Sequence, residues 1–408
     1  MKPITIVGGG LAGLTLGIGL RRKGVPVTIC EAGHYPRHRV CGEFISGQGQ
    51  DALARLGLCE PLVEAGAISA RTATFVLGEL QSPVRPLPVA ALCLSRFEMD
   101  AVLARHFCDL GGELRQQERW RDNDAGEGVV WANGRRAQTR ERGWRWFGLK
   151  VHARNVASVA DLEMHGSANG YVGITRLKDS EFNVCGLFRR PAAAREGAPA
   201  WTDAIKTIGR RAWLREKAAE GSRTPKPSAA QCALEKRASV LECGCPLPLS
   251  SAGGRDRHFT SHSAWTELLR GAPGTPLRAR LADAVFDESS FCSIAGLSLR
   301  PQRARDRSEC CVGDALTMIP PVTGNGMSMA FEAAELAIAP VAAYGRGEFT
   351  WARASQTLAR ACDEAFSRRL AWARWLQWMM FAPALRRGLG RVMLNSELVW
   401  QVMFARTR

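Results

Sequence analysis

Two glycine-rich segments hold the residues whose types and spacing favour chemistry. In the first, a Gly-x-Gly-x-x-Gly pattern that begins at Gly8 follows the apolar run Ile4–Val7 and precedes a long apolar stretch. Glycines at this spacing allow a tight turn and a close backbone approach, and the N–H groups that open the next helix attract phosphate. A second apolar run ends at Glu31, whose carboxylate is suited to bind a ribose. We therefore predict a dinucleotide site that includes Gly8, Gly10, Leu11, Ala12, Gly13 and Glu31.

The second segment lies far along the chain. A short apolar run ends at Gly313-Asp314, and Pro320-Pro321 then leads to Gly324 and an apolar helix that begins near Ser328. Such a turn presents backbone N–H groups and a helix dipole to a bound ring. The two segments together resemble the FAD motifs of the flavoprotein monooxygenase superfamily, which has the p-hydroxybenzoate hydroxylase fold and includes geranylgeranyl reductases and flavin-dependent halogenases. The resemblance implies FAD as cofactor, bound also by Asp314, Pro321, Gly324, Asn325, Gly326 and Met327.

Smaller matches to the same superfamily lie between these segments. Leu94–Asp100 resembles its arginine-bearing segment, which implies that Arg96 reaches the phosphate or ribityl side of the flavin. Arg39–Glu43 resembles the cysteine-glycine element of the reductases, which implies a cofactor contact for Arg39 and a proton-donor role for Cys41 in a reductase. A small buried hydrophobe is the alternative for that cysteine. Asn133-Gly134 stands where the monooxygenases carry an Asp-Gly that touches FAD and NADPH, so use of NADPH or NADH stays open.

The order of these segments predicts an α/β chain, α+β overall, with a discontinuous Rossmann-like FAD domain that begins with a βαβ unit. This domain is expected at residues 1–68, 94–142 and 291–345. Residues 69–93 and 143–290 are expected to form a substrate domain, because short aromatic and β-branched runs there predict an antiparallel sheet. Within it, residues 221–262 are rich in Ser, Gly and Pro and predict a disordered insertion or, alternatively, a substrate lid. Residues 346–408 are expected to be helical.

Aromatic and histidine side chains on the expected sheet are candidates to line a substrate cavity, although aromatic residues on strands are more often core. Both histidines are able to act as acid or base near neutral pH or to be structural. The candidates are Trp144, Trp146, His152, His165 and Phe188.

The resemblance leaves several reactions open. The favoured one is hydroxylation of a lipophilic aromatic or polyketide-like ring through a flavin C4a-hydroperoxide, which requires no protein nucleophile. The alternatives are reduction of an isoprenoid double bond and FAD binding without turnover. Halogenation is disfavoured, because the halogenases need a lysine between flavin and substrate and none occurs between Lys23 and Lys150.

Composition narrows the partners and the setting. The net charge is +16, but only eight of the 55 basic residues are lysine and they are scattered, which argues against nucleic acid. Thirteen cysteines without zinc-like spacing predict reduced thiols, no metal site and a cytoplasmic protein. The segment 365–408 carries tryptophans among arginines, which predicts either peripheral membrane contact or a helix pair packed on the substrate domain. A lipophilic small molecule fits both, and the oligomeric state stays open.

Overall fold

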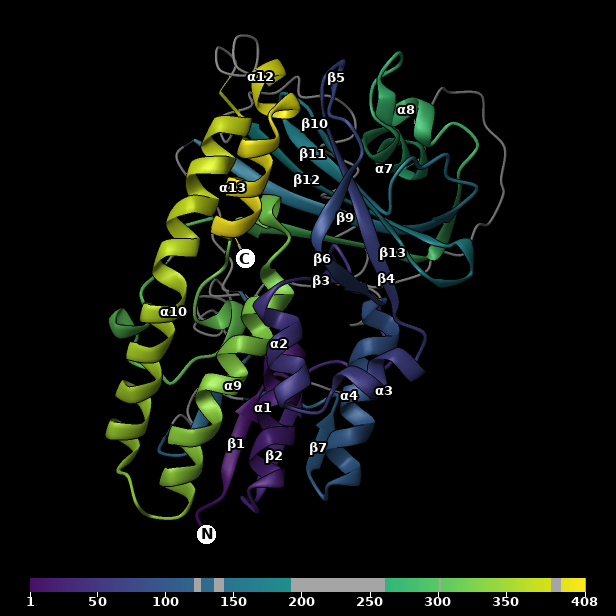
Figure 1. The fold of residues 1–408 in the computed structure, drawn as a ribbon. Helices are drawn as coiled ribbons and strands as arrows, with labels where there is room; N and C mark the ends of the chain where they lie inside the picture. The colour runs from purple at the N-terminus through teal and green to yellow at the C-terminus, as the bar shows by residue number, and fades with distance from the viewer. Residues whose placement is uncertain (121–125, 136–142, 192–260, 301, 383–389, 408) are drawn as a thin grey trace, which may run out of the picture.

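In the part of the chain that the structure describes, two sheets are joined by helices (Figure 1). The computed structural model describes residues 1–120, 126–135, 143–191, 261–300, 302–382 and 390–407. The insertion predicted at 221–262 lies outside these residues, apart from the first two residues of helix α7 (Ser261–Arg270).

The first sheet is parallel, and its four strands follow the order β7-β2-β1-β8. β1 (Ile4–Val7) lies between β2 (Val27–Glu31) and β8 (Val129–Trp131), and β7 (Glu113–Gln116) pairs with β2. Helix α1 (Leu11–Arg22) connects β1 to β2 and completes the predicted βαβ unit. β1 and β2 are mostly apolar, as expected of parallel strands covered on both faces.

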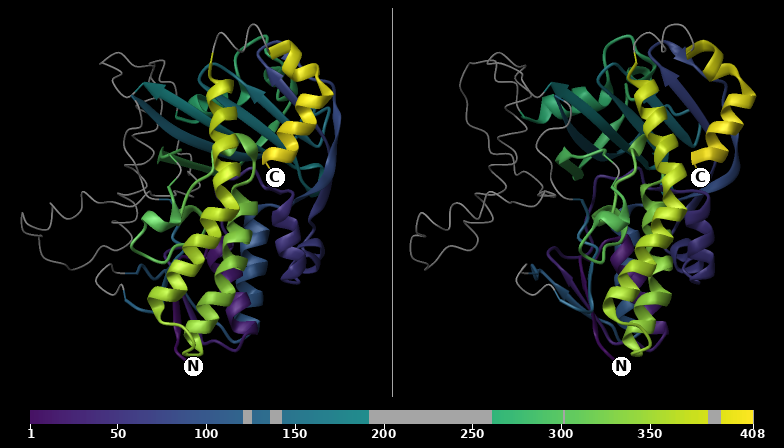
Figure 2. Two further views of the ribbon diagram at one scale, coloured as in Figure 1. Left: turned by 60° about the vertical axis from the view of Figure 1, so that its left-hand side comes forward. Right: turned by 90° about the vertical axis from the view of Figure 1, so that its left-hand side faces the viewer.

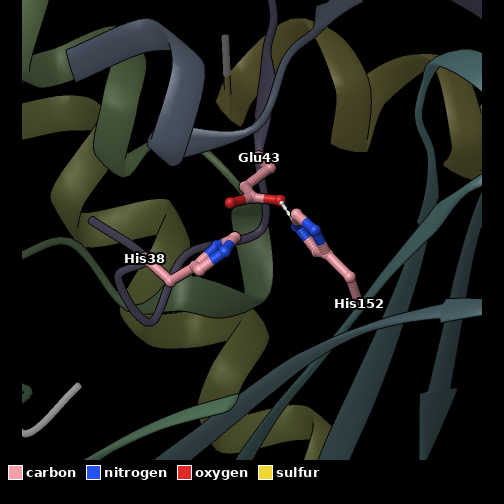
Figure 3. A group of neighbouring side chains, drawn as sticks. All are labelled: His38, Glu43 and His152. Atoms are coloured by element: carbon pink, nitrogen blue, oxygen red, sulfur yellow. Dashed lines mark hydrogen bonds and ion pairs between the residues drawn. The ribbon is translucent and has the colours of Figure 1, made fainter. Parts of the chain in front are cut away.

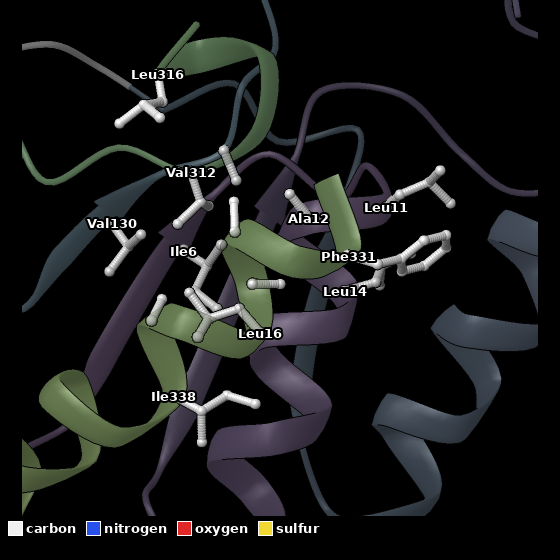
Figure 4. Packing of buried hydrophobic residues seen from close by; sticks show 14 of the residues in the cluster. Ile6, Leu11, Ala12, Leu14, Leu16, Val130, Val312, Leu316, Phe331 and Ile338 are labelled. Carbon is white, nitrogen blue, oxygen red and sulfur yellow. The ribbon is translucent and has the colours of Figure 1, made fainter. Parts of the chain in front are cut away.

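Helix α9 (Gly326–Gly345) packs closely on α1. A Cβ on Gly19 of α1 would lie 2.2 Å from Cδ1 of Ile338, so a larger residue there would have to displace the Ile338 side chain. Figure 4 shows Ile338 in the same buried cluster as Ile6 and Leu16. Among the described helices, α9 is long and apolar enough to cross a membrane, and 78% of its apolar window is buried inside the protein. That burial is typical of the core helix of a globular protein.

The second sheet is larger and mostly antiparallel. Its strands follow the order β13-β9-β12-β11-β10-β4-β6-β3, and β5 pairs with β4. β10 and β4 form its parallel pair. The strands are β3 (Phe44–Ile45), β4 (Ile68–Leu77), β5 (Leu80–Gln81), β6 (Arg85–Cys93), β9 (Trp144–Arg154), β10 (Leu162–Gly166), β11 (Gly170–Arg176), β12 (Phe182–Pro191) and β13 (Val285–Leu297). The predicted fold class is confirmed, but the expected boundary at 291 differs from the structure, because β13 pairs with β9 as far as Leu297.

Helices cover both sheets. Helix α4 (Arg96–Asp109) packs on α1, α2 (Gln48–Arg55) packs on α9, and α3 (Cys59–Glu64) contacts α2 and α4. The long α10 (Trp351–Met380) runs along α9 (Figures 1 and 2). Helices α7 and α8 (Pro276–Arg280) pack on one face of the second sheet. The chain ends with α12 (Gly390–Asn395) and α13 (Glu397–Thr407), and α13 lies beside the end of α10.

Candidate active site

A cavity of about 950 Å³ lies between the two sheets and receives residues from both predicted cofactor motifs. From the first motif, Gly8, Gly10, Leu11 and Ala12 line it, whereas Gly13 packs behind them. A Cβ on Gly13 would lie 2.0 Å from the carbonyl oxygen of Gly8, which explains a glycine there. Gly8 has φ +106, a conformation that L side chains rarely adopt. These residues sit between β1 and the start of α1, as the motif predicts.

Glu31 ends β2 and lines the cavity. Its carboxylate accepts hydrogen bonds from the backbone N–H of Gly9 and of Gly33, both at 2.8 Å, and pairs with Arg37 at 2.6 Å. Burial alone would raise the pKa of Glu31, but Arg39, Arg37 and these two N–H groups lower it. The carboxylate is therefore a fixed negative acceptor, and a ribose hydroxyl must share it with these donors.

Two arginines on the cavity wall share a buried acid that the sequence analysis missed. Asp100 is fully buried and accepts from Arg96 at 2.7 and 2.8 Å and from Nε of Arg39 at 3.1 Å. The i,i+4 spacing of Arg96 and Asp100 on α4 was the available signal. Asp100 fixes the positions of both guanidinium groups, which leaves a rigid positive wall suited to an anionic cofactor.

The second motif reaches the same cavity from beyond β8, where Cys311 forms a parallel bridge to Trp131. Asp314, Pro321, Gly324, Gly326 and Met327 all line it. Asn325 does not: it is buried, and its Oδ1 accepts from Oγ of Ser46 at 3.3 Å. The Asn325 side chain therefore ties the turn to the segment before α2, and the cofactor contact expected of this residue stays a prediction.

The shape of the cavity wall fits FAD. A Cβ on Gly10 or on Gly326 would meet nothing within 4 Å, so the backbone is bare where each helix opens toward the cavity. Two helix N-termini, two fixed arginines and an acceptor at Glu31 match a long, doubly charged dinucleotide. When bound, FAD supplies redox chemistry that no side chain provides.

None of the five predicted substrate-pocket residues lines this cavity. Strand alternation turns Phe188 toward the helix-covered face, where it stacks on Phe147. His165 faces the same way and bonds Glu163 at 2.9 Å. Trp144 and Trp146 lie near the start of β9, away from the cavity, where they contact Arg189 and Phe381 respectively. The cavity is lined from the second sheet by other apolar residues, which include Phe75, Leu87, Leu162, Met164, Tyr171 and Leu187.

His152, the fifth of these residues, belongs to a buried polar cluster with His38 and Glu43 (Figure 3). Its Nε2 lies 2.7 Å from Oε2 of Glu43, and its Nδ1 lies 3.2 Å from Glu181. Burial alone would lower the pKa of His152, but its hydrogen bonds to Glu181 and Glu43 raise it. The histidine therefore lies behind the cavity wall, where Glu43 separates it from the cavity.

The same cluster has the donor atoms of a metal site, but the side-chain nitrogen of a lysine lies among these donors. Nζ of the fully buried Lys150 lies 3.4 Å from Oε1 of Glu43 and 3.0 Å from Nδ1 of His38. Burial and Lys150 lower the pKa of His38 to about 4. Burial would raise the pKa of Glu43, but Lys150 and His152 lower it to about 2. The ammonium group thus supplies the positive charge that a cation would bring.

Cys41 lines the cavity beside Glu43. Burial raises the pKa of its thiol, although Arg96 acts in the opposite direction. Its carbonyl accepts from the Asn183 amide at 2.9 Å, and the carbonyl of Gly42 accepts from Oγ1 of Thr175 at 2.9 Å. Residues 41–43 are therefore fixed against the second sheet, between it and the cofactor motifs.

Comparison with known proteins agrees with this geometry. Residues 1–152 match the family model described as an FAD-binding domain. The brominase of 1H-pyrrole-2-carbonyl peptidyl-carrier protein from Pseudoalteromonas luteoviolacea is 30% identical over 115 residues, a match that spans 28% of this chain and 28% of that protein.

Solved structures extend the likeness to the whole fold. The flavin-dependent brominase Bmp2 is 16% identical with a TM-score of 0.65, over 98% of this chain and 92% of that chain. PqsL of P. aeruginosa in complex with 2-aminobenzoylacetate is 13% identical with a TM-score of 0.59, over 96% of this chain and 100% of that chain. Residues 1–152 are therefore an FAD-binding domain, the cofactor is FAD, and the chain as a whole has the fold of these flavin-dependent enzymes.

Proposed function

We propose that this flavoprotein is a monooxygenase that hydroxylates an apolar aromatic substrate. The observation that carries the proposal is the apolar wall that the second sheet presents to the cofactor cavity, with Phe75, Met164 and Leu187 among its residues. A ring that is itself electron-rich attacks an activated oxygen without help from a protein nucleophile. The requirement on the chain is then to bind the ring, orient it and keep water away.

The segment of residues 41–43, the strap, supports a role of the chain in orienting the substrate rather than in reacting with it. Its backbone carbonyls are held by Asn183 and Thr175, so it forms a fixed partition between sheet and cofactor motifs. Arg96 donates its backbone N–H to Glu43 at 2.9 Å, which links the strap to the start of α4. Fixed walls of this kind favour a defined approach of substrate to cofactor.

Two other reactions, double-bond reduction and halogenation, are distinguished from hydroxylation by the experiments described below. Double-bond reduction is kept because Cys41 lines the cavity, where a protonated thiol is able to donate a proton. Halogenation is kept because halogenases share the fold. Against halogenation, Lys150 is fully buried and already paired with Glu43 and His38. Asn133 and Gly134 also line the cavity. Which of NADPH and NADH serves as the electron donor is to be measured by the kinetics of flavin reduction.

The test starts from the visible spectrum of the purified protein and identification of the chromophore released by acid. The FAD-loaded protein is then reduced and mixed with ¹⁸O₂ and a neutral aromatic probe, 1-naphthol or indole. Hydroxylation predicts one ¹⁸O atom in the product. A product that carries bromine or chlorine when the halide is added, or no oxygenated product with either probe, contradicts the proposal.

The variant Cys41→Ala separates the reductase from the oxygenase. Under hydroxylation it retains FAD and keeps ¹⁸O incorporation close to that of the wild type. Under reduction, anaerobic turnover of geranylgeraniol with reduced flavin falls steeply in the variant while FAD is retained.

A further inference from the structure

The cavity has an apolar lobe at the end formed by β4, β6, β10 and the C-terminal helix. Its residues line the cavity and belong to one buried cluster, and they are Phe44, Phe75, Leu87, Leu162, Trp400 and Phe404. Thr74 also lines this end, but its hydroxyl is already bonded to Ser82. Nothing in the lobe so defined offers a charge to a ligand.

The lobe adjoins the second cofactor motif. The ring of Phe44 lies directly against the turn before α9, because a Cβ on Gly324 would be 2.0 Å from Cζ of Phe44. Phe44 is thus shared between the lobe and the turn on which the flavin is expected to rest. A molecule held in the lobe would therefore lie next to the cofactor.

Helix α13 forms the part of the lobe's wall that does not belong to the second sheet. Trp400 and Phe404, one turn apart, face inward, and the Trp400 ring meets the Phe75 ring edge-on at 5.6 Å. Leu398 and Val402 lie on the other side of the helix and are 71% and 41% exposed. The helix therefore inserts two aromatic side chains into the cavity and leaves its opposite face in solvent.

A buried arginine fixes this helix to the sheet. Nε of Arg85 on β6 pairs with Glu397 at 3.0 Å, and its Nη1 donates to the carbonyl of Leu394 at 2.8 Å. Its guanidinium also lies 5.7 Å from the centre of the Trp400 ring. These three contacts hold the start of α13 where Trp400 enters the lobe, so the position of Trp400 is set by the fold.

We propose that α13 is the specificity wall of the substrate site and that Trp400 sets the size of the uncharged, flat aromatic molecule that the lobe accepts. This inference rests on the proposed function for the identity of the bound ring as substrate. Removing the indole would enlarge the lobe, because large-to-small changes in packed sites leave a cavity, and apolar cavities bind apolar molecules.

The experiment measures binding of 1-aminoanthracene, a neutral tricyclic fluorophore, to FAD-loaded wild type and to Trp400→Ala. We expect the variant to bind the probe about tenfold more tightly, since the lost indole makes room for a third ring. The matched control is Leu398→Ala on the exposed face of the same helix, for which no change in affinity is expected. Trp400→Leu is a milder second variant that keeps the helix packed if Trp400→Ala does not fold.

The visible spectrum of the flavin supplies a readout that a merely structural tryptophan would not move. Probe bound in the lobe is expected to perturb the flavin bands, because Phe44 joins the lobe to the cofactor turn. Equal affinities in the wild type and both Trp400 variants, or binding without any change in the flavin bands, would overturn the proposal. A wild-type protein that contains no FAD would instead overturn the proposed function, and the probe affinities of the three variants would still test the wall.

Discussion

Replacing Glu43 by glutamine removes the one carboxylate that Lys150 and His152 share. Lys150 is fully buried, and its partners are Glu43 and His38. Glutamine keeps the shape of the side chain and an oxygen for the backbone N–H of Arg96, but not the charge. Breaking a buried pair by removing one partner costs about 3–5 kcal/mol, because the other charge stays desolvated. We therefore expect Glu43→Gln to lower the free energy of unfolding by about this amount.

The lowered pKa of Glu43 leads to a magnitude of the same order. A pKa lowered from 4.5 to about 2 in a fully buried carboxyl corresponds to about 3 kcal/mol. Because the folded-state pKa is lowered, this stability is fully present above about pH 4.5 and is lost as the pH falls toward 2. The variant should lack this part of the acid-induced loss of stability.

Urea unfolding of the FAD-loaded protein at pH 7 provides the assay, within a double-mutant cycle with Lys150→Met. Glu43→Gln leaves the buried Lys150 without its carboxylate, and Lys150→Met leaves Glu43 with His152 and the Arg96 N–H as its partners. The double variant removes both charges of the Glu43–Lys150 pair, so it should cost less than the two single costs added together. Glu335→Gln is the matched control, because it breaks an exposed pair with Arg55 and should cost about 1 kcal/mol or less. Single variants that behave like this control, or strictly additive costs in the double, would refute the reasoning.

Two further predictions concern the cofactor turn and the acid response. Gly10→Ala should leave the Tm of the apoprotein unchanged but reduce FAD retention, since its Cβ would enter the open cavity. Gly8→Ala should lower the Tm itself, because φ is +106 and the new Cβ would lie 2.5 Å from the carbonyl oxygen of Ala132. Equal Tm losses in the two variants would contradict this contrast. His38→Asn should flatten the fall in Tm between about pH 6.5 and 4, because burial lowers the folded-state pKa of His38 to about 4 and the wild type loses stability as the unfolded state takes up the proton. An acid profile identical to that of the wild type would exclude this role for His38.

The cofactor half of the site was predictable from the sequence because its signals are local. Each motif places strand, turn and helix within a few residues, and the bare backbone at Gly10 and Gly326 follows from the residue type alone. The parallel sheet and the antiparallel sheet follow from their different hydrophobic patterns. The neighbours of these turns, such as Asp100, which pairs with Arg39 and Arg96, depend on tertiary packing. The i,i+4 spacing of Arg96 and Asp100 only suggested their contact.

The substrate half was not predictable in the same way, because alternation along a strand says which residues share a face but not what covers that face. Trp146, Gly148 and Lys150 share one side of β9, yet Gly148 lines the cavity while Lys150 lies behind Glu43. The pairing of Glu43 with Lys150 joins a strap to a strand far away in sequence. The curvature of the sheet and the path of residues 41–43 decide these contacts, and a short stretch of sequence determines neither of them.

The C-terminal tryptophans show how such packing changes a functional inference. The sequence of segment 365–408 left two interpretations open, peripheral membrane contact and a helix pair packed on the substrate domain. In the structure, Trp400 and Phe404 turn inward onto the cavity. Exposed aromatic surface remains on α10, where Trp375 and Trp378 are 45% and 62% exposed beside the exposed Arg374. Peripheral membrane contact therefore stays a prediction for this face of α10. Because α10 packs against α13, whose Trp400 lines the cavity, a lipophilic substrate that arrives at α10 would next meet the helix that carries Trp400, which ties the choice of substrate to the surface from which it arrives.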